Sequence, residues 1–323
     1  MRTCVFVVHE GFQLLDLAGP LDVFRAATLV GASPGYRTLV ATPTGLPVTA
    51  DSGVQVAADT SLARLRRNRT PIDTLVVVGG LGTRALSQDR RAVGNVAALA
   101  RRVRRTTSVC TGAFVLAAAG LLDGRRATTH WASCDELAGA HPAVEVQPDL
   151  IYVRDGEVWT SAGVTAGVDL ALALVDDDHG ADLAHQVAGW LVVFARRPGG
   201  QAQFSAQLLA HPARTPAVAA LQQWLPDHLE EDLGVEALAR RAAMSPRTFA
   251  RLFRAETGTT PAAYVEALRV EAARRLLETT DLTVAAVAGA VGLRHAETLY
   301  RAFRRRVGTT PDDYRRHFNH RAS

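Results

Sequence analysis

Residues 106–120 read TTSVCTGAFVLAAAG, a strand-like run that passes through a cysteine into an alanine-rich helix. The periodicity changes at Cys110, so the sequence predicts a sharp strand-to-helix turn at this position. A turn of this kind at the edge of a parallel sheet points a side chain into the crevice where α/β domains hold their ligands. Cys110 is therefore our marker for a ligand site or an active site.

Strand and helix signals alternate on both sides of this turn. Two short apolar runs, TCVFVVH (3–9) and IDTLVVVGG (72–80), are rich in β-branched residues and end in turn residues, as fully buried parallel strands do. A helical stretch, LDVFRAATLV (21–30), lies between them, and a hairpin-like pair of strands flanks Gly156. We expect a doubly wound, flavodoxin-like α/β domain.

The end of the strand signals sets the predicted domain boundaries. A helical run (181–197) is followed by a stretch rich in Gly, Pro and Gln (198–216), and no credible strand occurs after it. We therefore predict an α/β domain over residues 1–180, a helix and connecting segment over 181–216, and an all-helical domain over 217–323.

Charge is distributed unevenly between these parts. Residues 240–323 contain sixteen Arg and eight Asp or Glu, a net charge of +8. Because the whole chain carries +4, residues 1–239 carry −4. A basic tail behind a mildly acidic front indicates a polyanionic partner such as double-stranded DNA. From charge alone, a solvated basic face remains an equal alternative.

Cysteine spacing and hydropathy exclude several classes of protein. The three cysteines, Cys4, Cys110 and Cys134, have no ligand-like spacing, so we expect neither a disulfide framework nor a metal site. We also expect no cofactor. No apolar run reaches the roughly 18 residues that span a bilayer, and the chain begins directly with a strand-like segment. We expect a cytoplasmic protein with no membrane partner.

The helical tail contains an internal repeat. RTFARLFRAETGTTPAAY (247–264) aligns with ETLYRAFRRRVGTTPDDY (297–314) at an offset of 50. Before each copy a short helix leads into a tight turn, and in the first copy Ser245 is a good N-cap for the second helix. The second helices end at Gly258 and Gly308, where a left-handed cap is favourable. The pattern predicts a helix-turn-helix, twice.

The second helix of each copy has one apolar face and one polar face. Phe249, Leu252 and Phe253 should pack inward in the first copy, which leaves arginines on the opposite face. Arginine at positions i and i+4 suits a major groove, because its two hydrogen bonds to guanine discriminate bases by about 1–3 kcal/mol. The candidate DNA-binding residues are Arg247, Arg251, Arg254, Glu297, Tyr300, Arg301 and Arg304.

Residues 218–317 resemble the AraC/XylS family of transcription regulators. The resemblance rests on LARRAAMSPRTFARLFRAETGTTPAAYVEALRVEAARRLLE and on VAAVAGAVGLRHAETLYRAFRRRVGTTPDDYRR. It implies DNA as a partner, contact with RNA polymerase, and base-facing positions at Arg247, Ala250, Arg251 and Arg254, then Ala296, Glu297, Tyr300 and Arg301. Ala250 cannot hydrogen-bond a base, so the family's operator sequences do not transfer to this chain.

The front part contains residues that could act with Cys110. The N–H groups of Thr111 and Gly112 would lie at a helix N-terminus, where they favour negative charge. His130 follows in ATTHW, and Asp16 lies in HEGFQLLDLAGPLDVF after the first strand. Less specific alternatives stay open, because His130 beside Trp131 fits a packed histidine and Asp16 fits a helix cap.

This arrangement resembles the ThiJ/PfpI group of the class I glutamine amidotransferase-like superfamily over residues 3–178. Cys110 matches the group's elbow cysteine, His130 its nearby histidine and Asp16 its acidic partner. Members include isonitrile hydratases, in which an Asp and the Cys act on a small carbon electrophile. No Glu after His130 completes the Cys-His-Glu set that glutaminase activity needs.

The order of the two parts resembles the GlxA group of bacterial regulators. That resemblance implies a homodimeric transcription regulator whose front domain senses a small-molecule effector, and it implies no catalytic role. The expected effector-binding residues are Asp16, Gly80, Cys110, Thr111 and His130. Two alternatives remain: an isonitrile-hydratase-like enzyme that uses Cys110 and Asp16, and a redox sensor in which Cys110 is oxidised.

Overall fold

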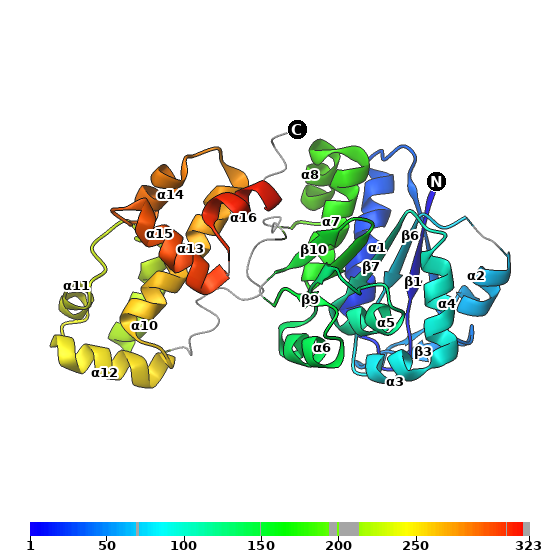
Figure 1. Cartoon of the computed structure of the whole chain (residues 1–323), viewed down its shortest axis with the longest axis horizontal. Coiled ribbons are helices and arrows are strands. Elements are labelled where there is room, and N and C mark those ends of the chain that lie inside the picture. Colours follow the sequence, from blue (N-terminus) through cyan, green and yellow to red (C-terminus); the bar gives the residue numbers. More distant parts are fainter. Residues whose placement is uncertain (69–70, 149, 194–198, 200–212, 308, 319–323) are drawn as a thin grey trace. The chain divides into compact units, whose positions relative to one another are not determined.

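The computed structural model describes residues 1–68, 71–148, 150–193, 199, 213–307 and 309–318. The chain divides into two compact units, Met1–Gly199 and Gly200–Ser323 (Figure 1). The first unit contains the α/β sheet and the second is helical, as the sequence predicts. No helix in the described part of the chain is long and apolar enough to cross a membrane.

The first unit is built on a seven-stranded sheet. Every neighbouring pair is parallel except β10 and β11, which form the predicted hairpin around Gly156. This arrangement confirms a doubly wound, flavodoxin-like α/β fold. The order across the sheet is β10 (Tyr152–Asp155), β11 (Val158–Ser161), β7 (Arg105–Val109), β6 (Thr74–Val77), β1 (Arg2–Val7), β2 (Tyr36–Thr42) and β5 (Thr60–Ser61). Two small ladders join β3 (Val48–Thr49) to β4 (Gln55–Val56) and β8 (Arg126–Ala127) to β9 (Glu145–Val146).

Alternate residues of the central strands bury opposite faces of the sheet. In β1, Cys4 and Phe6 belong to one apolar core, and Val5 and Val7 belong to the other. The first core packs under α1 (Leu14–Leu29), α7 (Ala166–His179) and α8 (Ala181–Trp190). The second packs under α2 (Leu62–Asn68), α3 (Thr83–Gln88), α4 (Arg90–Ala100), α5 (Ala113–Ala118) and α6 (Cys134–Ala140).

The first unit extends beyond the boundary that we predicted at residue 180. Helix α8, which we assigned to the connecting segment, buries Ala184, Val187 and Ala188 in the core that it shares with α1 and α7. Apolar burial therefore places α8 in the first unit, which reaches Gly199. Most of the rest of the predicted connection lies outside the described residues.

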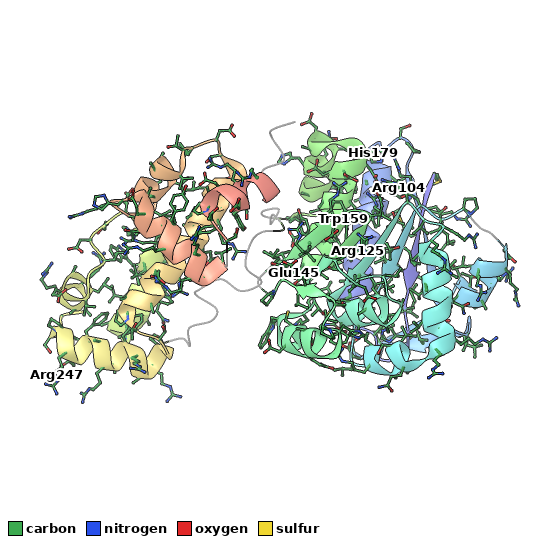
Figure 2. All side chains as sticks on the ribbon, in the orientation of Figure 1. Arg104, Arg125, Glu145, Trp159, His179 and Arg247 are labelled. Carbon is green, nitrogen blue, oxygen red and sulfur yellow. The ribbon has the colours of Figure 1, made fainter. Side chains whose placement is uncertain are left out.

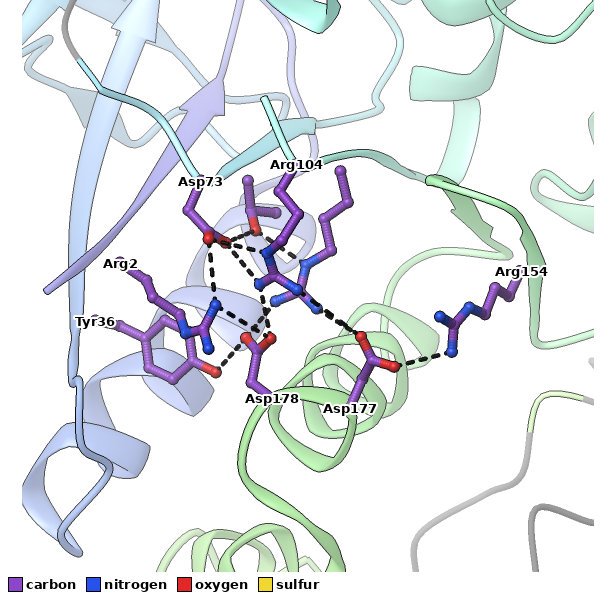
Figure 3. Close-up of polar contacts among 9 residues, drawn as sticks. Arg2, Tyr36, Asp73, Arg104, Arg154, Asp177 and Asp178 are labelled. Atoms are coloured by element: carbon purple, nitrogen blue, oxygen red, sulfur yellow. Dashed lines mark hydrogen bonds and ion pairs between the residues drawn. The ribbon is translucent and has the colours of Figure 1, made fainter. Parts of the chain in front are cut away.

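An ion-pair network lies at the amino ends of β6 and β7, whereas Cys110 follows the carboxyl end of β7. Figure 3 shows this network. Arg105, at the start of β7, is 2% exposed and pairs with Asp178 and, at 3.2 Å, with Asp177. Arg104 pairs with Asp73 at 2.9 Å and with Asp178 at 2.7 Å. These contacts fix the carboxyl end of α7 to the first residues of β6 and β7.

The second unit contains two small apolar cores that share one long helix. Its helices are α10 (Pro216–Trp224), α11 (Val235–Arg241), α12 (Pro246–Thr257), α13 (Pro261–Thr279), α14 (Val284–Ala290), α15 (Ala296–Val307) and α16 (Pro311–Phe318), with a 3-10 turn η3 (Leu225–Asp227) after α10. The first part of α13 places Tyr264 and Leu268 in one core, and its second part places Ala273 and Leu277 in the other. Helix α13 therefore links the two helix-turn-helix copies.

The repeated GTTP sequence ends one helix and starts the next. Gly258 takes a left-handed φ of 79° at the end of α12. The side chain of Thr260 then accepts a hydrogen bond from the backbone N–H of Ala263 at 3.3 Å, and Pro261 is the first residue of α13. Thr310 caps α16 in the same way, and Gly308 lies outside the described residues.

Candidate functional sites

Cys110 begins a tight turn between β7 and α5, as the sequence predicts. It opens the 3-10 turn η1 (Cys110–Gly112) with a φ of 57°, in the left-handed region that is unfavourable for a residue with a side chain. Two glycines make room for this turn. A Cβ atom on Gly163 would lie 2.2 Å from the Cys110 Cβ, and one on Gly79 would lie 2.7 Å from it. Gly79 is one of the turn residues that end the apolar run at 72–80, whereas no local pattern in the sequence marks Gly163.

Asp16 lies in the first turn of α1 and is fully buried. It is next to the turn at Cys110–Gly112, which we call the elbow. Its Oδ1 accepts a hydrogen bond of 2.6 Å from the backbone N–H of Val164, next to Gly163. Its Oδ2 is buried and makes no hydrogen bond of ordinary geometry with the described residues, although the Cys110 thiol and the Gly79 backbone lie close enough to act on the carboxyl. Burial raises the pKa of this carboxyl to about 6, although the hydrogen bond from Val164 acts in the opposite direction. Protonation of Asp16 is therefore accessible close to neutral pH.

Cys110 is 7% exposed. Burial raises its pKa, the negative charge of Asp16 raises it further, and the result is about 12. Cysteines that act as nucleophiles or redox sensors have a lowered pKa, because the thiolate is the reactive form. At neutral pH this elbow presents a protonated thiol next to a buried carboxyl group.

A buried polar network continues from the elbow. The backbone N–H of Gly80 donates to Thr111 Oγ1 at 2.9 Å, and Thr111 Oγ1 lies 3.0 Å from Thr83 Oγ1. His9 Nε2 lies 3.3 Å from the same Thr83 hydroxyl, and burial lowers the pKa of His9. Gly80 and Thr111 were predicted from the sequence as site residues, whereas His9 and Thr83 were not. The position of His9 at the end of the first apolar run was the available signal.

The segment that contains His130 contacts Cys110, but the His130 ring itself bonds to its own loop. Its Nδ1 accepts a hydrogen bond of 3.4 Å from the backbone N–H of Ala132, and its ring centre lies 5.6 Å from that of Trp131. The preceding residue, Thr129, donates its hydroxyl to the Cys110 carbonyl oxygen at 2.9 Å. Within the described residues no hydrogen bond links the His130 ring to Cys110 or Asp16, so this geometry fits the packed-histidine alternative. No cluster of three or more potential metal ligands occurs in that same set of residues.

The first recognition helix, α12, has the two faces that its sequence predicts. Phe249 and Phe253 are fully buried, whereas Arg247, Arg251 and Arg254 are exposed. None of the three guanidinium groups forms a hydrogen bond or an ion pair with another described residue. Figure 2 shows Arg247 projecting from the amino end of α12. Ser245 caps the helix by accepting a hydrogen bond from the backbone N–H of Thr248 at 3.3 Å.

The polar residues of the second recognition helix, α15, differ in whether they bond to other described residues. Glu297, Arg301 and Arg304 are exposed, and their side chains form no hydrogen bond or ion pair within the described chain. The hydroxyl of Tyr300, by contrast, donates to Asp312 of α16. No local sequence pattern predicts this bond, because Asp312 lies twelve positions further on.

Comparisons with known proteins give the same division of the chain. The DJ-1/PfpI family matches residues 1–177, and a helix-turn-helix domain matches residues 238–317. The HTH-type transcriptional regulator CdhR of Pseudomonas aeruginosa is 32% identical over 96% of this chain and 90% of its own. The HTH-type transcriptional regulator GlxA of Rhizobium meliloti is 30% identical over 96% of this chain and 94% of its own.

Other relatives match only part of the chain. Isonitrile hydratase of Pseudomonas putida is 38% identical over 56% of this chain and 74% of its own. A crystal structure of a ThiJ/PfpI family protein from Pseudomonas syringae is 27% identical, with a TM-score of 0.55, and covers 75% of this chain and 88% of its own. CdhR and GlxA, which each match 96% of this chain, are both named as transcriptional regulators. The chain belongs to the DJ-1/PfpI family and, over nearly its whole length, to the helix-turn-helix transcriptional regulators in which that domain precedes an AraC-type DNA-binding domain.

Proposed function

We propose that this DNA-binding transcription regulator is controlled by a small metabolite bound beside Cys110 in the first unit. The supporting observation is the buried Asp16 carboxylate, whose Oδ2 makes no hydrogen bond of ordinary geometry with the described residues, although the Cys110 thiol lies close enough to lower the carboxyl pKa. Leaving a buried polar group unpaired costs about 1–3 kcal/mol. A ligand that donates an N–H or O–H group to Asp16 recovers that cost, so the proposed metabolite is a hydrogen-bond donor.

The proposed ligand site uses the groups around the elbow. Asp16 would accept a hydrogen bond, and the Cys110 thiol, the Thr111 hydroxyl and the Gly80 backbone would line the site. His130 would border it, since its segment contacts the Cys110 carbonyl through Thr129. The metabolite changes DNA binding only if it binds two states of the protein with different affinity.

The proposed DNA contacts lie on the two recognition helices. The guanidinium groups of the exposed arginines on these helices have no hydrogen-bond or ion-pair partner within the described chain, so they can bind guanine edges or phosphates. They belong to Arg247, Arg251 and Arg254 of α12 and to Arg301 and Arg304 of α15. Glu297 at the start of α15 would accept a hydrogen bond from cytosine N4. Tyr300 would face the DNA with its ring while Asp312 holds its hydroxyl.

An isonitrile-hydratase-like activity is the second candidate function. The 38% identity of the first unit to isonitrile hydratase favours it. The protonated Cys110 thiol, with a pKa of about 12, weighs against both a nucleophilic cysteine and a redox sensor. Incubation of the full chain with a panel of small isonitriles tests this activity, because turnover that disappears in Cys110→Ala would establish it.

The remaining partners follow from the proposed regulatory role. A homodimer through the first unit would place two DNA-binding units on neighbouring sites, and contact with RNA polymerase would convert binding into altered transcription. The proposed location is the cytoplasm, where the DNA of the bacterial relatives lies. Cross-linking of the full chain in solution tests the dimer, and a monomer at working concentrations would contradict it.

Genome-wide mapping of bound DNA in the source cells, followed by affinity measurements, tests effector control. Metabolites processed by enzymes encoded beside the mapped sites are added to the full chain and a mapped duplex. We expect one of them to change the affinity. We also expect Asp16→Asn to lose this response while it keeps the effector-free affinity.

Asp22→Asn is the matched control, because Asp22 lies on the same helix and is exposed. It should respond to the metabolite like the wild-type chain. A full response in Asp16→Asn would contradict the proposed position of the site.

A further inference from the structure

Each recognition helix is linked near its carboxyl end to a neighbouring segment by a charged side chain. In the first copy this side chain is acidic, and in the second copy it is basic. In the first copy, Glu256 of α12 accepts hydrogen bonds from the Thr215 hydroxyl at 2.7 Å, from the Thr215 N–H at 3.1 Å and from the Arg214 N–H at 3.0 Å. Thr215 precedes α10 directly. Arg306 of α15 is the repeat equivalent of Glu256, at the offset of 50.

In the second copy the acid is on the supporting helix. Arg306 Nε donates to Glu266 Oε1 of α13 at 2.8 Å, and Arg306 Nη2 donates to the Ala263 carbonyl oxygen at 2.7 Å. Arg305 pairs with the other oxygen of the same carboxylate. Burial alone would raise the pKa of Glu266, but the hydrogen bonds from Arg306 and Arg305 hold it below its usual value. Glu266 is therefore ionised at neutral pH and neutralises part of the charge of both arginines.

The opposite charges of the two links determine which arginines of the recognition helices can bind DNA. The first link uses backbone N–H groups and a hydroxyl, so it engages no guanidinium group. The second link engages two guanidinium groups that neighbour Arg301 and Arg304 on the same helix. Arginines in this position can bind phosphates, which adds affinity for every DNA sequence alike.

We propose that Glu266 is a specificity-determining residue that withholds Arg305 and Arg306 from DNA phosphates and positions α15 against α13. It touches no base in this role. It acts through the two arginines, by leaving base-reading residues of α15 exposed while it removes sequence-independent charge from the helix. The inference depends on DNA binding by the second unit and not on the proposed effector, so its failure would leave effector control untouched.

The salt dependence of binding to a duplex of random sequence tests this role in the full-length chain. Each phosphate contact changes the slope of log K against log salt by about −0.9. Glu266→Gln removes the negative charge that both arginines bind. This frees Arg305 and leaves Arg306 held only by the Ala263 carbonyl among the described residues, so the slope should become steeper by about 1–2. The ratio of affinities for a mapped site and the random duplex should fall in the same variant.

Glu256→Gln is the matched control, because it also removes one negative charge and breaks a link of this kind but frees no arginine. Its slope should equal that of the wild-type chain. The double variant Arg305→Ala with Arg306→Ala should also keep the wild-type slope, because these arginines do not contact phosphates while Glu266 is present. This variant tests the proposal independently if Glu266→Gln fails to fold.

Two results would overturn the role of Glu266. The first is an equal steepening in Glu266→Gln and Glu256→Gln, which would trace the change to net charge alone. The second is a flatter slope in the double alanine variant, which would mean that Arg305 and Arg306 already bind phosphates in the wild-type protein.

Discussion

The carboxyl group of Asp16 and the thiol of Cys110 shift each other's pKa inside the first unit. Burial raises the pKa of both groups, to about 6 for Asp16 and about 12 for Cys110, and the charge of Asp16 contributes to the higher value. The family's elbow geometry is therefore present, whereas the ionisation that makes an elbow cysteine reactive is suppressed.

Replacing Asp16 with asparagine should make Cys110 more reactive. The substitution removes the neighbouring negative charge, so the thiol pKa falls below about 12 and the thiolate fraction at a given pH rises. Mass spectrometry of peptides after timed alkylation with iodoacetamide measures this rate separately for each cysteine. We expect faster alkylation of Cys110 in Asp16→Asn than in the wild-type chain at mildly alkaline pH.

Cys4 and Cys134 are internal controls for that experiment, because both are buried elsewhere in the first unit. Their alkylation rates should not change, which would exclude general loosening of the fold. An unchanged Cys110 rate would mean that Asp16 does not determine the thiol's ionisation.

Asp178→Asn should strongly destabilise the first unit. Arg105 is 2% exposed, and this change removes the buried carboxylate of Asp178, which leaves the partly exposed Asp177 at 3.2 Å as its remaining ion-pair partner among the described residues. Removing one partner of a buried ion pair costs about 3–5 kcal/mol when no second partner remains, so we expect a loss near the lower end of that range. Urea denaturation followed by tryptophan fluorescence measures the loss, and Trp159 in β11 reports on this unit.

Asp177→Asn is the matched comparison, since Asp177 neighbours Asp178 but its side chain is 26% exposed. Partly exposed pairs contribute about 0–1 kcal/mol, so this variant should remain near wild-type stability. Equal losses in the two variants would show that burial of Asp178 is not what makes the network important.

The stability of the second unit should fall as the pH rises toward neutrality. Glu278 is buried and accepts a hydrogen bond from Tyr314, and burial raises its pKa from 4.5 to about 7. A carboxyl whose folded pKa is raised favours the folded state in its protonated form. That stability is complete below the unfolded pKa and is lost between pH 4.5 and about 7, by about 3 kcal/mol.

Glu278→Gln should remove this pH dependence, because the amide oxygen still accepts from Tyr314 and nothing titrates. Melting curves of the full chain, followed by helical circular dichroism at about pH 5 and about pH 8, measure the effect. The variant should gain stability over the wild-type chain at the higher pH and match it at the lower one. A loss of stability at both values would contradict a raised pKa for Glu278.

The sequence predicted those features that depend on local periodicity and turn chemistry. The elbow at Cys110, the strand pair around Gly156 and the caps at Ser245 and Gly258 each follow from a few neighbouring residues, and the structure contains all of them. Contacts between distant segments could not be predicted in this way. Gly163 packs against Cys110 across more than fifty positions, and no local pattern marks it.

The same distinction explains the outcome for the candidate sites. His130 and Cys110 suggested a catalytic pair because their residue types suit one, but only the fold shows that His130 bonds to its own loop. The helical pattern predicts that Arg305 is an exposed arginine like its neighbours. Only the packing of α15 on α13 shows that it forms an ion pair with Glu266. Side-chain partners depend on tertiary packing, which helical periodicity does not determine.

Replacing Arg251 or Arg301 with alanine should weaken sequence-specific binding more than general binding to DNA. Both side chains lie on exposed faces of the recognition helices and form no hydrogen bond or ion pair within the described chain, so each is free to read a base. Loss of a bidentate arginine contact costs about 1–3 kcal/mol at its base position. Competition between a mapped duplex and single-base variants of it measures this loss. Arg275→Ala, an exposed arginine of α13, should leave the discrimination unchanged. If both recognition-helix variants kept full discrimination as well, the base-reading faces of α12 and α15 would have to lie elsewhere on these helices.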